Sequence, residues 1–120
     1  MIKTVFDLEV FKLSYQIAMD IFRVTKTFSK EERYSLTNQI IRSSRSVSAN
    51  VAEGWGKRIY ENEFKRHLIY VMGSLEETKV WLHFALDCSY ISVEFFSEIE
   101  KKLDDSGGKI YKLYENWKTF

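Results

Sequence analysis

Few residues of this 120-residue chain could perform acid–base, nucleophilic or metal chemistry. His67 and His83 stand on one predicted helix, sixteen positions and therefore about 24 Å apart, too far to share a metal ion. Glu63 and His67 have the i, i+4 spacing, but a di-iron bundle needs Glu-x-x-His motifs from two helices, and the sequence has none. We therefore predict no catalytic site, no metal and no cofactor, and expect both histidines to be ordinary surface or core-edge residues.

The single cysteine and the glycine-rich segment give no better candidate. Cys88 has no basic or histidine neighbour in sequence, so we expect it to be packed in the core. Gly54–Lys57 lacks the length of a phosphate-binding loop and the hydroxyl residue after its lysine. With no signal-peptide pattern and no apolar run near the roughly 18 residues of a membrane span, we expect a cytoplasmic protein. Because no acid–base pair converges in the sequence, we also expect that the protein is not an enzyme.

Basic side chains remain as a candidate site. The net charge is +1, but residues 29–66 carry eight basic and five acidic side chains, and residues 67–105 carry three and eight. This asymmetry could serve an anionic partner or pair helices within the protein. Basic groups neutralise phosphates, and the nearby Trp55 and Tyr60 could stack on bases. The candidate nucleic-acid-binding residues are Arg42, Arg45, Lys57, Arg58, Lys65 and Arg66.

Apolar residues recur at helical spacing in four segments, with no proline and only five glycines to interrupt them. The segments are Thr4–Phe28, Ser29–Gly56, Tyr60–Tyr90 and one from Ser92 to Trp117 that keeps its phase through Gly107 and Gly108. Four long helices with short connections predict an all-α, antiparallel up-down-up-down four-helix bundle in a single domain, residues 1–120.

The second segment reads "QIIRSSRSVSANVAEGWGKR" and could be mistaken for a linker. Ser44, Ser48 and Ala52 nevertheless follow one another at i, i+4 and i+8, which predicts a helix that is thin on one side and lets a neighbour approach closely.

Capping signals predict where this helix starts and stops. Ser29 with Glu32 three positions later forms a capping-box pattern for its start, and Gly54 and Gly56 are expected to end it.

The third segment carries a second apolar line opposite its main stripe, and two tyrosines widen the apolar surface of the fourth. A helix that is apolar on both sides is usually buried on both sides, so we predict a homo-oligomer. The predicted interface residues are Ile69, Gly73, Val80, Phe84, Tyr111 and Tyr114.

Two stretches resemble the four-helix-bundle family of 23S ribosomal RNA intervening-sequence proteins. They are "FSKEERYSLTNQIIRSSRSVSANVAEGWGKR" and "EFKRHLIYVMGSLEETKVWL". The matching residues are Glu32, Leu36, Thr37, Gln39, Ile40, Arg42, Ser46 or Ser48, Asn50, Val51, Ala52, Glu53, Gly54, Gly73, Ser74, Leu75 and Glu77. Two positions differ: Ser29 stands where proline is frequent, and Ile41-Arg42 replaces two adjacent basic residues.

The resemblance implies an up-and-down bundle that assembles into a homopentameric ring, and the family is not known for enzymes. A related branch accompanies, and binds, the reverse transcriptases of diversity-generating retroelements. Two functions follow as expectations. One is an oligomer that binds RNA or other nucleic acid. The alternative is an adaptor for a protein such as a reverse transcriptase or polymerase, without direct nucleic-acid contact.

Overall fold

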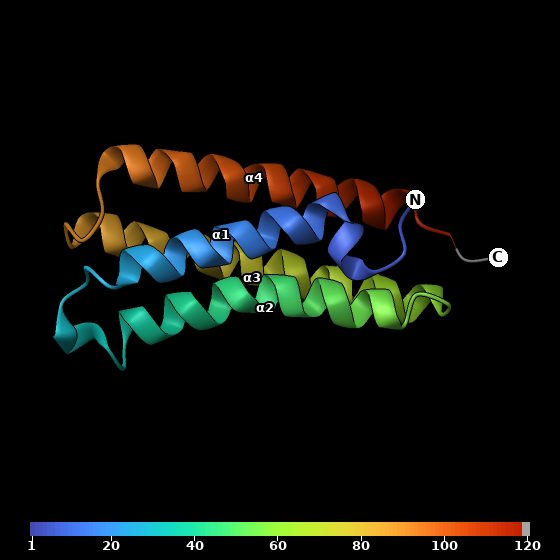
Figure 1. The fold of residues 1–120 in the computed structure, drawn as a ribbon, viewed down its shortest axis with the longest axis horizontal. Coiled ribbons are helices and arrows are strands. Elements are labelled where there is room, and N and C mark those ends of the chain that lie inside the picture. Colours follow the sequence, from blue (N-terminus) through green and yellow to red (C-terminus); the bar gives the residue numbers. More distant parts are fainter. Residues whose placement is uncertain (119–120) are drawn as a thin grey trace.

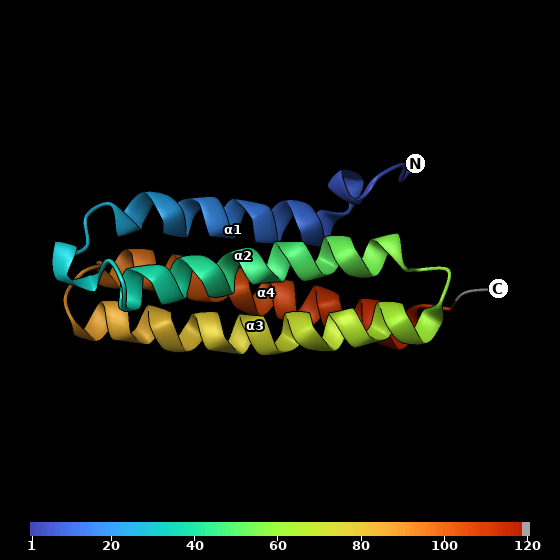
Figure 2. The ribbon, with the colours of Figure 1, turned by 90° about the horizontal axis from the view of Figure 1, so that it is seen from below.

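The computed structural model describes residues 1–118, and its regular structure over that range is entirely helical. The long helices are α1 (Glu9–Thr25), α2 (Leu36–Gly56), α3 (Glu61–Asp87) and α4 (Val93–Asn116), with two 3-10 turns, η1 (Val5–Asp7) and η2 (Lys30–Glu32). Successive long helices run in opposite directions along a bundle of 50 × 25 × 22 Å (Figures 1 and 2). The predicted all-α fold of four helices is confirmed.

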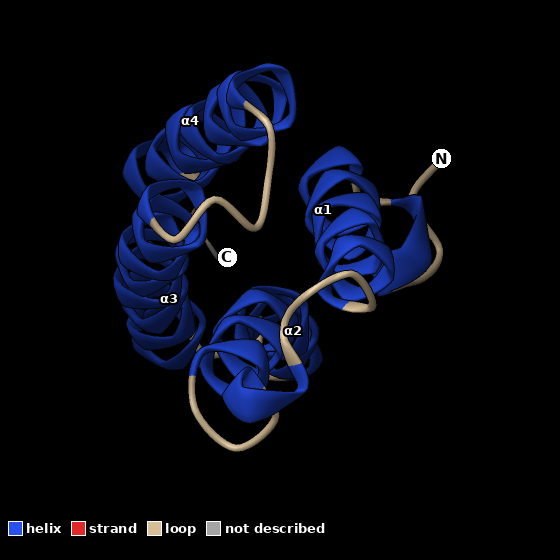
Figure 3. Ribbon diagram, turned by 90° about the vertical axis from the view of Figure 1, so that its left-hand side faces the viewer, coloured by secondary structure: helices blue, strands red, loops and turns tan. Residues whose placement is uncertain are grey.

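Each helix packs against two others. α1 and α3 both contact α2 and α4, so they occupy opposite corners when the bundle is viewed along its axis (Figure 3). Short turns join α2 to α3 and α3 to α4, and a longer connection that contains η2 joins α1 to α2, so consecutive helices are neighbours.

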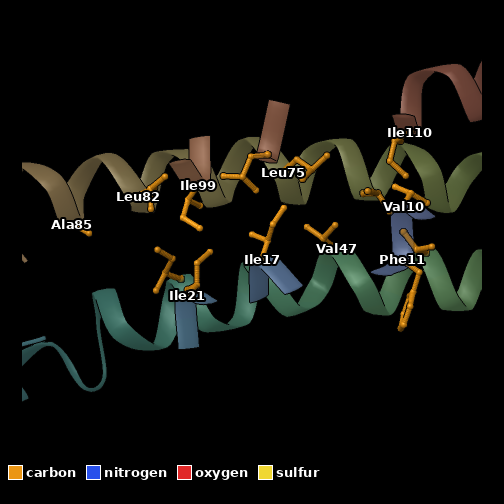
Figure 4. Packing of buried hydrophobic residues seen from close by; sticks show 14 of the residues in the cluster. Val10, Phe11, Ile17, Ile21, Val47, Leu75, Leu82, Ala85, Ile99 and Ile110 are labelled. Atoms are coloured by element: carbon orange, nitrogen blue, oxygen red, sulfur yellow. The ribbon is translucent and has the colours of Figure 1, made fainter. Parts of the chain in front are cut away.

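The core lies along the bundle axis and is built from the predicted apolar stripes. Ile21, Ile40, Leu68 and Ile99 are completely buried, and Figure 4 shows such side chains meeting between the helices. Burial of one such side chain contributes roughly 1.5–3 kcal/mol.

The first helix is shorter than the predicted Thr4–Phe28. The Thr4 hydroxyl accepts a hydrogen bond from the Phe6 amide, and the Asp7 carboxylate accepts one from the Thr4 amide. These bonds close η1 as a separate turn, because a side chain that satisfies local amides competes with helix continuation. Phe6 is consequently 63% exposed and does not belong to the core stripe.

The prediction that Ser29 starts the second long helix is wrong. Ser29 caps η2 by accepting a hydrogen bond from the Glu31 amide, and α2 begins only at Leu36. The Glu32 carboxylate instead serves the start of α2, because it accepts hydrogen bonds from the Ser35 hydroxyl (2.6 Å) and the Leu36 amide (3.4 Å). The sequence signal was a genuine cap, but it belongs to a turn that precedes the helix.

α2 ends at Gly56, where the sequence predicted its stop, but no left-handed glycine ends it. Gly54 lies inside the helix, and no glycine of the described residues has a positive φ. The Arg58 guanidinium donates to the Trp55 carbonyl at 2.8 Å and so satisfies a terminal acceptor of α2. In α4, Gly107 and Gly108 are helical as predicted.

The thin side of α2 faces α1. The Ser48 hydroxyl donates to the Ser14 hydroxyl of α1 at 3.2 Å, and Ser44 is buried. The small side chains let these two hydroxyls meet, but beside them the space between Ala52 and α1 stays open.

Glu32 also gives the bundle a pH-dependent contact. The Ser35 hydroxyl, and after it the Tyr90 hydroxyl at 3.0 Å, donate to the carboxylate and hold the pKa of Glu32 below its ordinary value of 4.5. Because folding lowers this pKa, the associated stabilisation is fully present above the unfolded value. It is lost as the pH falls through the lower folded value.

We predict that the melting temperature of Glu32→Gln falls less than that of the parent between about pH 6 and about pH 3. Glu31→Gln, in the same turn, is the matched control and should keep the parental slope. Thermal melts followed by circular dichroism measure both, and identical pH profiles for the parent and Glu32→Gln would contradict the role assigned to this carboxylate.

Candidate functional site

Four of the six predicted nucleic-acid-binding residues lie at one end of the bundle. α2 ends and α3 begins there, which brings the two pairs of cations to the same turn. We call this group, Lys57, Arg58, Lys65 and Arg66, the basic end (Figure 2).

Two cations of the basic end have acidic partners on the same helix. Lys65 Nζ lies 3.4 Å from Glu61 Oε2, and Arg66 Nη2 lies 2.7 Å from Glu63 Oε1. Exposed pairs at i, i+4 and i, i+3 spacing contribute only about 0.3–0.5 kcal/mol, so a phosphate could compete for these cations. The sequence already contained these glutamates at helical spacing.

The aromatic residues at the basic end differ in accessibility. The Arg58 guanidinium lies over the Trp55 ring at 4.1 Å, and Trp55 also packs edge-on against Trp117. Tyr60 is 65% exposed. Of the two rings proposed for base stacking, Tyr60 is therefore the open one.

A chain of polar contacts crosses from α2 to α3 behind the basic end. Lys57 Nζ lies 3.2 Å from Nε2 of the buried His67, and His67 Nδ1 lies 3.2 Å from Asn50 Oδ1. Because an ammonium group can only donate, Nε2 accepts, so Nδ1 carries the proton and donates to Asn50. His67 is thus a core-edge histidine, one of the two placements that the sequence predicted, and both of its ring nitrogens have partners.

The same contacts continue along the two helices. Asn50 Nδ2 donates to the Ser46 carbonyl at 2.9 Å, and the hydroxyls of Ser46 and Ser74 lie 2.9 Å apart. One turn further, the Thr78 hydroxyl donates to the buried Ser43 hydroxyl at 2.9 Å. Sequence analysis missed this network, although the polar positions on α2 were its visible signal.

Gly54 allows α2 and α3 to approach at this point. A Cβ atom on Gly54 would lie 2.8 Å from His67 Cβ and 3.3 Å from a ring carbon of Phe64. Both neighbours belong to buried side chains of α3, so neither can move away easily.

Arg42 and Arg45 lie elsewhere. They are exposed on the outer side of α2, and the Arg45 guanidinium lies 5.3 Å from the Phe22 ring of α1. Twelve residues separate Arg45 from Lys57, which is about 18 Å along the helix. The six candidate residues therefore form two groups.

The predicted interface residues of α3 share one outward side. Ile69, Gly73, Val80 and Phe84 are all exposed, and we call this set the α3 face. On α4, Tyr111 is exposed, whereas Tyr114 is half-buried with Lys65 Nζ 5.2 Å from its ring.

The remaining candidate residues form no chemical centre. His83 is exposed and pairs with Glu100 at 3.4 Å. Cys88 is exposed, contrary to prediction, because it caps the end of α3 where the chain turns outward. Residues 1–118 hold no group of three side chains suited to a metal ion, and none of their helices could span a membrane.

Comparison with known families and solved structures shows what the chain is similar to. Residues 6–117 match the family model of the 23S rRNA-intervening sequence protein. The chain belongs to this family. Its fold is also similar to a crystal structure from Bacteroides thetaiotaomicron VPI-5482, a protein with unknown function from the S23 ribosomal protein family. The TM-score is 0.78 at 20% sequence identity, covering 89% of this chain and 99% of that one. No curated protein matches the chain.

In this 23S rRNA-intervening sequence protein, the segment that carried the resemblance has a structural explanation. Asn50 holds His67 in one orientation, and Gly54 leaves the space that His67 and Phe64 occupy. The segment therefore fixes how α2 packs on α3.

We predict that Gly54→Ala lowers the free energy of unfolding by about 1–2 kcal/mol. Overpacking costs roughly 1–3 kcal/mol, more than the gain of about 1 kcal/mol in helix propensity. Gly108→Ala is the matched control, because it lies inside α4 with open space around its Cβ position, and it should stabilise the protein. Urea unfolding measures both, and a Gly54→Ala variant as stable as Gly108→Ala would refute the close contact.

Proposed function

We propose that this 23S rRNA-intervening sequence protein is a non-enzymatic homo-oligomer, a pentamer, that binds RNA or other nucleic acid through its basic end. The observation that carries the proposal is the apolar α3 face. Ile69, Val80 and Phe84 are 51%, 49% and 53% exposed along one side of a single helix. An apolar stripe of this length on a charged protein surface favours burial against another subunit.

Symmetry links the two halves of the proposal. Closed rings of identical subunits repeat every surface feature, so a basic end on one subunit recurs around the ring. Within one subunit the acids Glu61 and Glu63 offset the charges of Lys65 and Arg66, so the basic end is a weak phosphate site. Several weak sites on one particle can bind one nucleic acid together, and avidity then compensates for the low charge of each site.

We predict that light scattering on a dilute solution gives about five times the chain mass of 14.3 kDa. Val80→Asp should reduce this to the mass of one chain while the helix content persists, because the charge would have to be buried in the interface. Val93→Asp is the matched control, an exposed valine on another helix, and should leave the oligomer intact. A monomeric parent protein would refute the oligomer.

Binding to RNA and DNA should weaken steeply as salt increases and should depend little on sequence, because phosphate contacts dominate. Reversing all four cations of the basic end to glutamate should abolish binding, with oligomer and helix content unchanged. Reversing the exposed Lys101 and Lys112 of α4 is the control. Fluorescence anisotropy over a salt series gives the number of phosphates contacted from the slope.

The second candidate function is a protein-binding adaptor, and the acidic partners of Lys65 and Arg66 favour it. Cations already paired within their own helix attract phosphates less strongly. If the parent binds no nucleic acid at low salt, or the reversed and parent proteins bind equally, the adaptor function replaces nucleic-acid binding. The related proteins that accompany reverse transcriptases make such an enzyme the first partner to test.

A further inference from the structure

We infer that the α3 face of one subunit seats in an apolar groove between α1 and α2 of a second copy. This inference rests on the homo-oligomer proposed above and identifies the two different surfaces that meet in it. The groove has a volume of about 440 Å³. The lining residues that matter here are Phe11, Tyr15 and Met19 of α1 and Ser48, Ala49 and Ala52 of α2.

The thin side of α2 creates this groove. Ser48, Ala49 and Ala52 have short side chains, so the space beside α1 is not filled from the α2 side. Tyr15 stands at the edge and is 53% exposed. A floor of small residues below aromatic walls can receive apolar side chains that project from another helix.

The α3 face has the shape to enter such a groove. Ile69, Val80 and Phe84 project from one side of a helix of 27 residues, and the space around Gly73 is open to a neighbouring side chain. α1 and α3 occupy opposite corners of the bundle, so this face cannot reach the groove of its own subunit (Figure 3). A second copy has to provide the partner surface.

Charge supports a groove-to-face contact over a face-to-face contact. Arg45 lines the groove, and Arg42 is exposed one turn earlier. The α3 face carries the exposed Glu76 and Glu77 between Gly73 and Val80. Two α3 faces placed together would oppose acid with acid, which is unfavourable, whereas the groove offers arginine to glutamate.

Lys79 offsets only part of this negative charge, because its ammonium is shared between Glu76 and Asp104. Its Nζ lies 3.2 Å from Glu76 Oε1 but closer to Asp104 Oδ1 of α4, at 2.6 Å. The ammonium is thus directed toward α4, and the Glu76 side chain remains 76% exposed. Since each subunit then offers one groove and one face, the contacts repeat head to tail, which is how identical subunits close into a ring.

Two blocked variants test this inference. Ala49→Trp fills the groove, Val80→Asp blocks the face, and each protein alone should be monomeric in sedimentation velocity. Mixed together, they retain one intact groove and one intact face, so the mixture should form a 1:1 dimer and nothing larger. Gln16→Trp, exposed on another side of α1, is the control and should assemble like the parent.

The outcomes separate this inference from the proposed oligomer. If Ala49→Trp assembles like the parent while Val80→Asp does not, the α3 faces pair with each other, so the groove inference is wrong and the oligomer stands. The same holds if both variants are monomeric and their mixture forms no dimer. A parent that is itself monomeric overturns both proposals.

Exchanging the charges of the two proposed interface surfaces is an independent test of the inference. Arg42→Glu with Arg45→Glu, and separately Glu76→Lys with Glu77→Lys, should each raise the concentration at half-assembly about tenfold or more. A chain carrying all four changes should recover assembly, because the opposite charges face each other again. No recovery in a chain with parental helix content would overturn the arginine–glutamate contact.

Discussion

The close packing of α2 on α3 is the constraint on which most of this structure depends. Gly54 has no space for a Cβ atom against His67 and Phe64, and hydroxyl and amide groups replace large apolar side chains further along the contact. A buried polar group left without its partner costs about 1–3 kcal/mol, so the network admits one register of the two helices. The short connection between the two helices then keeps Lys57, just after α2, and Lys65 of α3 at the same end of the bundle.

The small residues of α2 have opposite consequences on its two sides. Toward α3 they form hydrogen bonds: the Thr78 hydroxyl donates to Ser43, and the hydroxyls of Ser46 and Ser74 bond to each other. Toward α1 the Ser48 hydroxyl bonds to Ser14, and the space beside this contact is an open apolar groove. The same composition that makes one contact specific thus leaves the other incomplete. This incomplete contact and the exposed apolar face of α3 are the physical basis of the proposed assembly, and the proposed nucleic-acid binding depends on the weak sites that such an assembly repeats.

Helix periodicity was readable in the sequence, because neighbours three or four positions apart decide it. The four helices, the continuity of α4 through its glycines, the α3 face and the gathering of the basic end all followed from spacing. It was harder to predict whether a capping side chain starts a long helix or closes a separate turn before it. The caps at Thr4 and Ser29 close separate 3-10 turns, and only the relative geometry of several amides distinguishes such a turn from the start of a long helix.

The sequence by itself determined the number, order and apolar faces of the helices, together with the family motif around Asn50 and Gly54. The tertiary structure alone decided what those residues do. Gly54 stands against α3 rather than ending α2, His67 bridges Lys57 and Asn50, and Cys88 faces outward. The reason is physical: spacing fixes which side of a helix a residue occupies, but distance, partner and burial depend on a second helix that is remote in sequence.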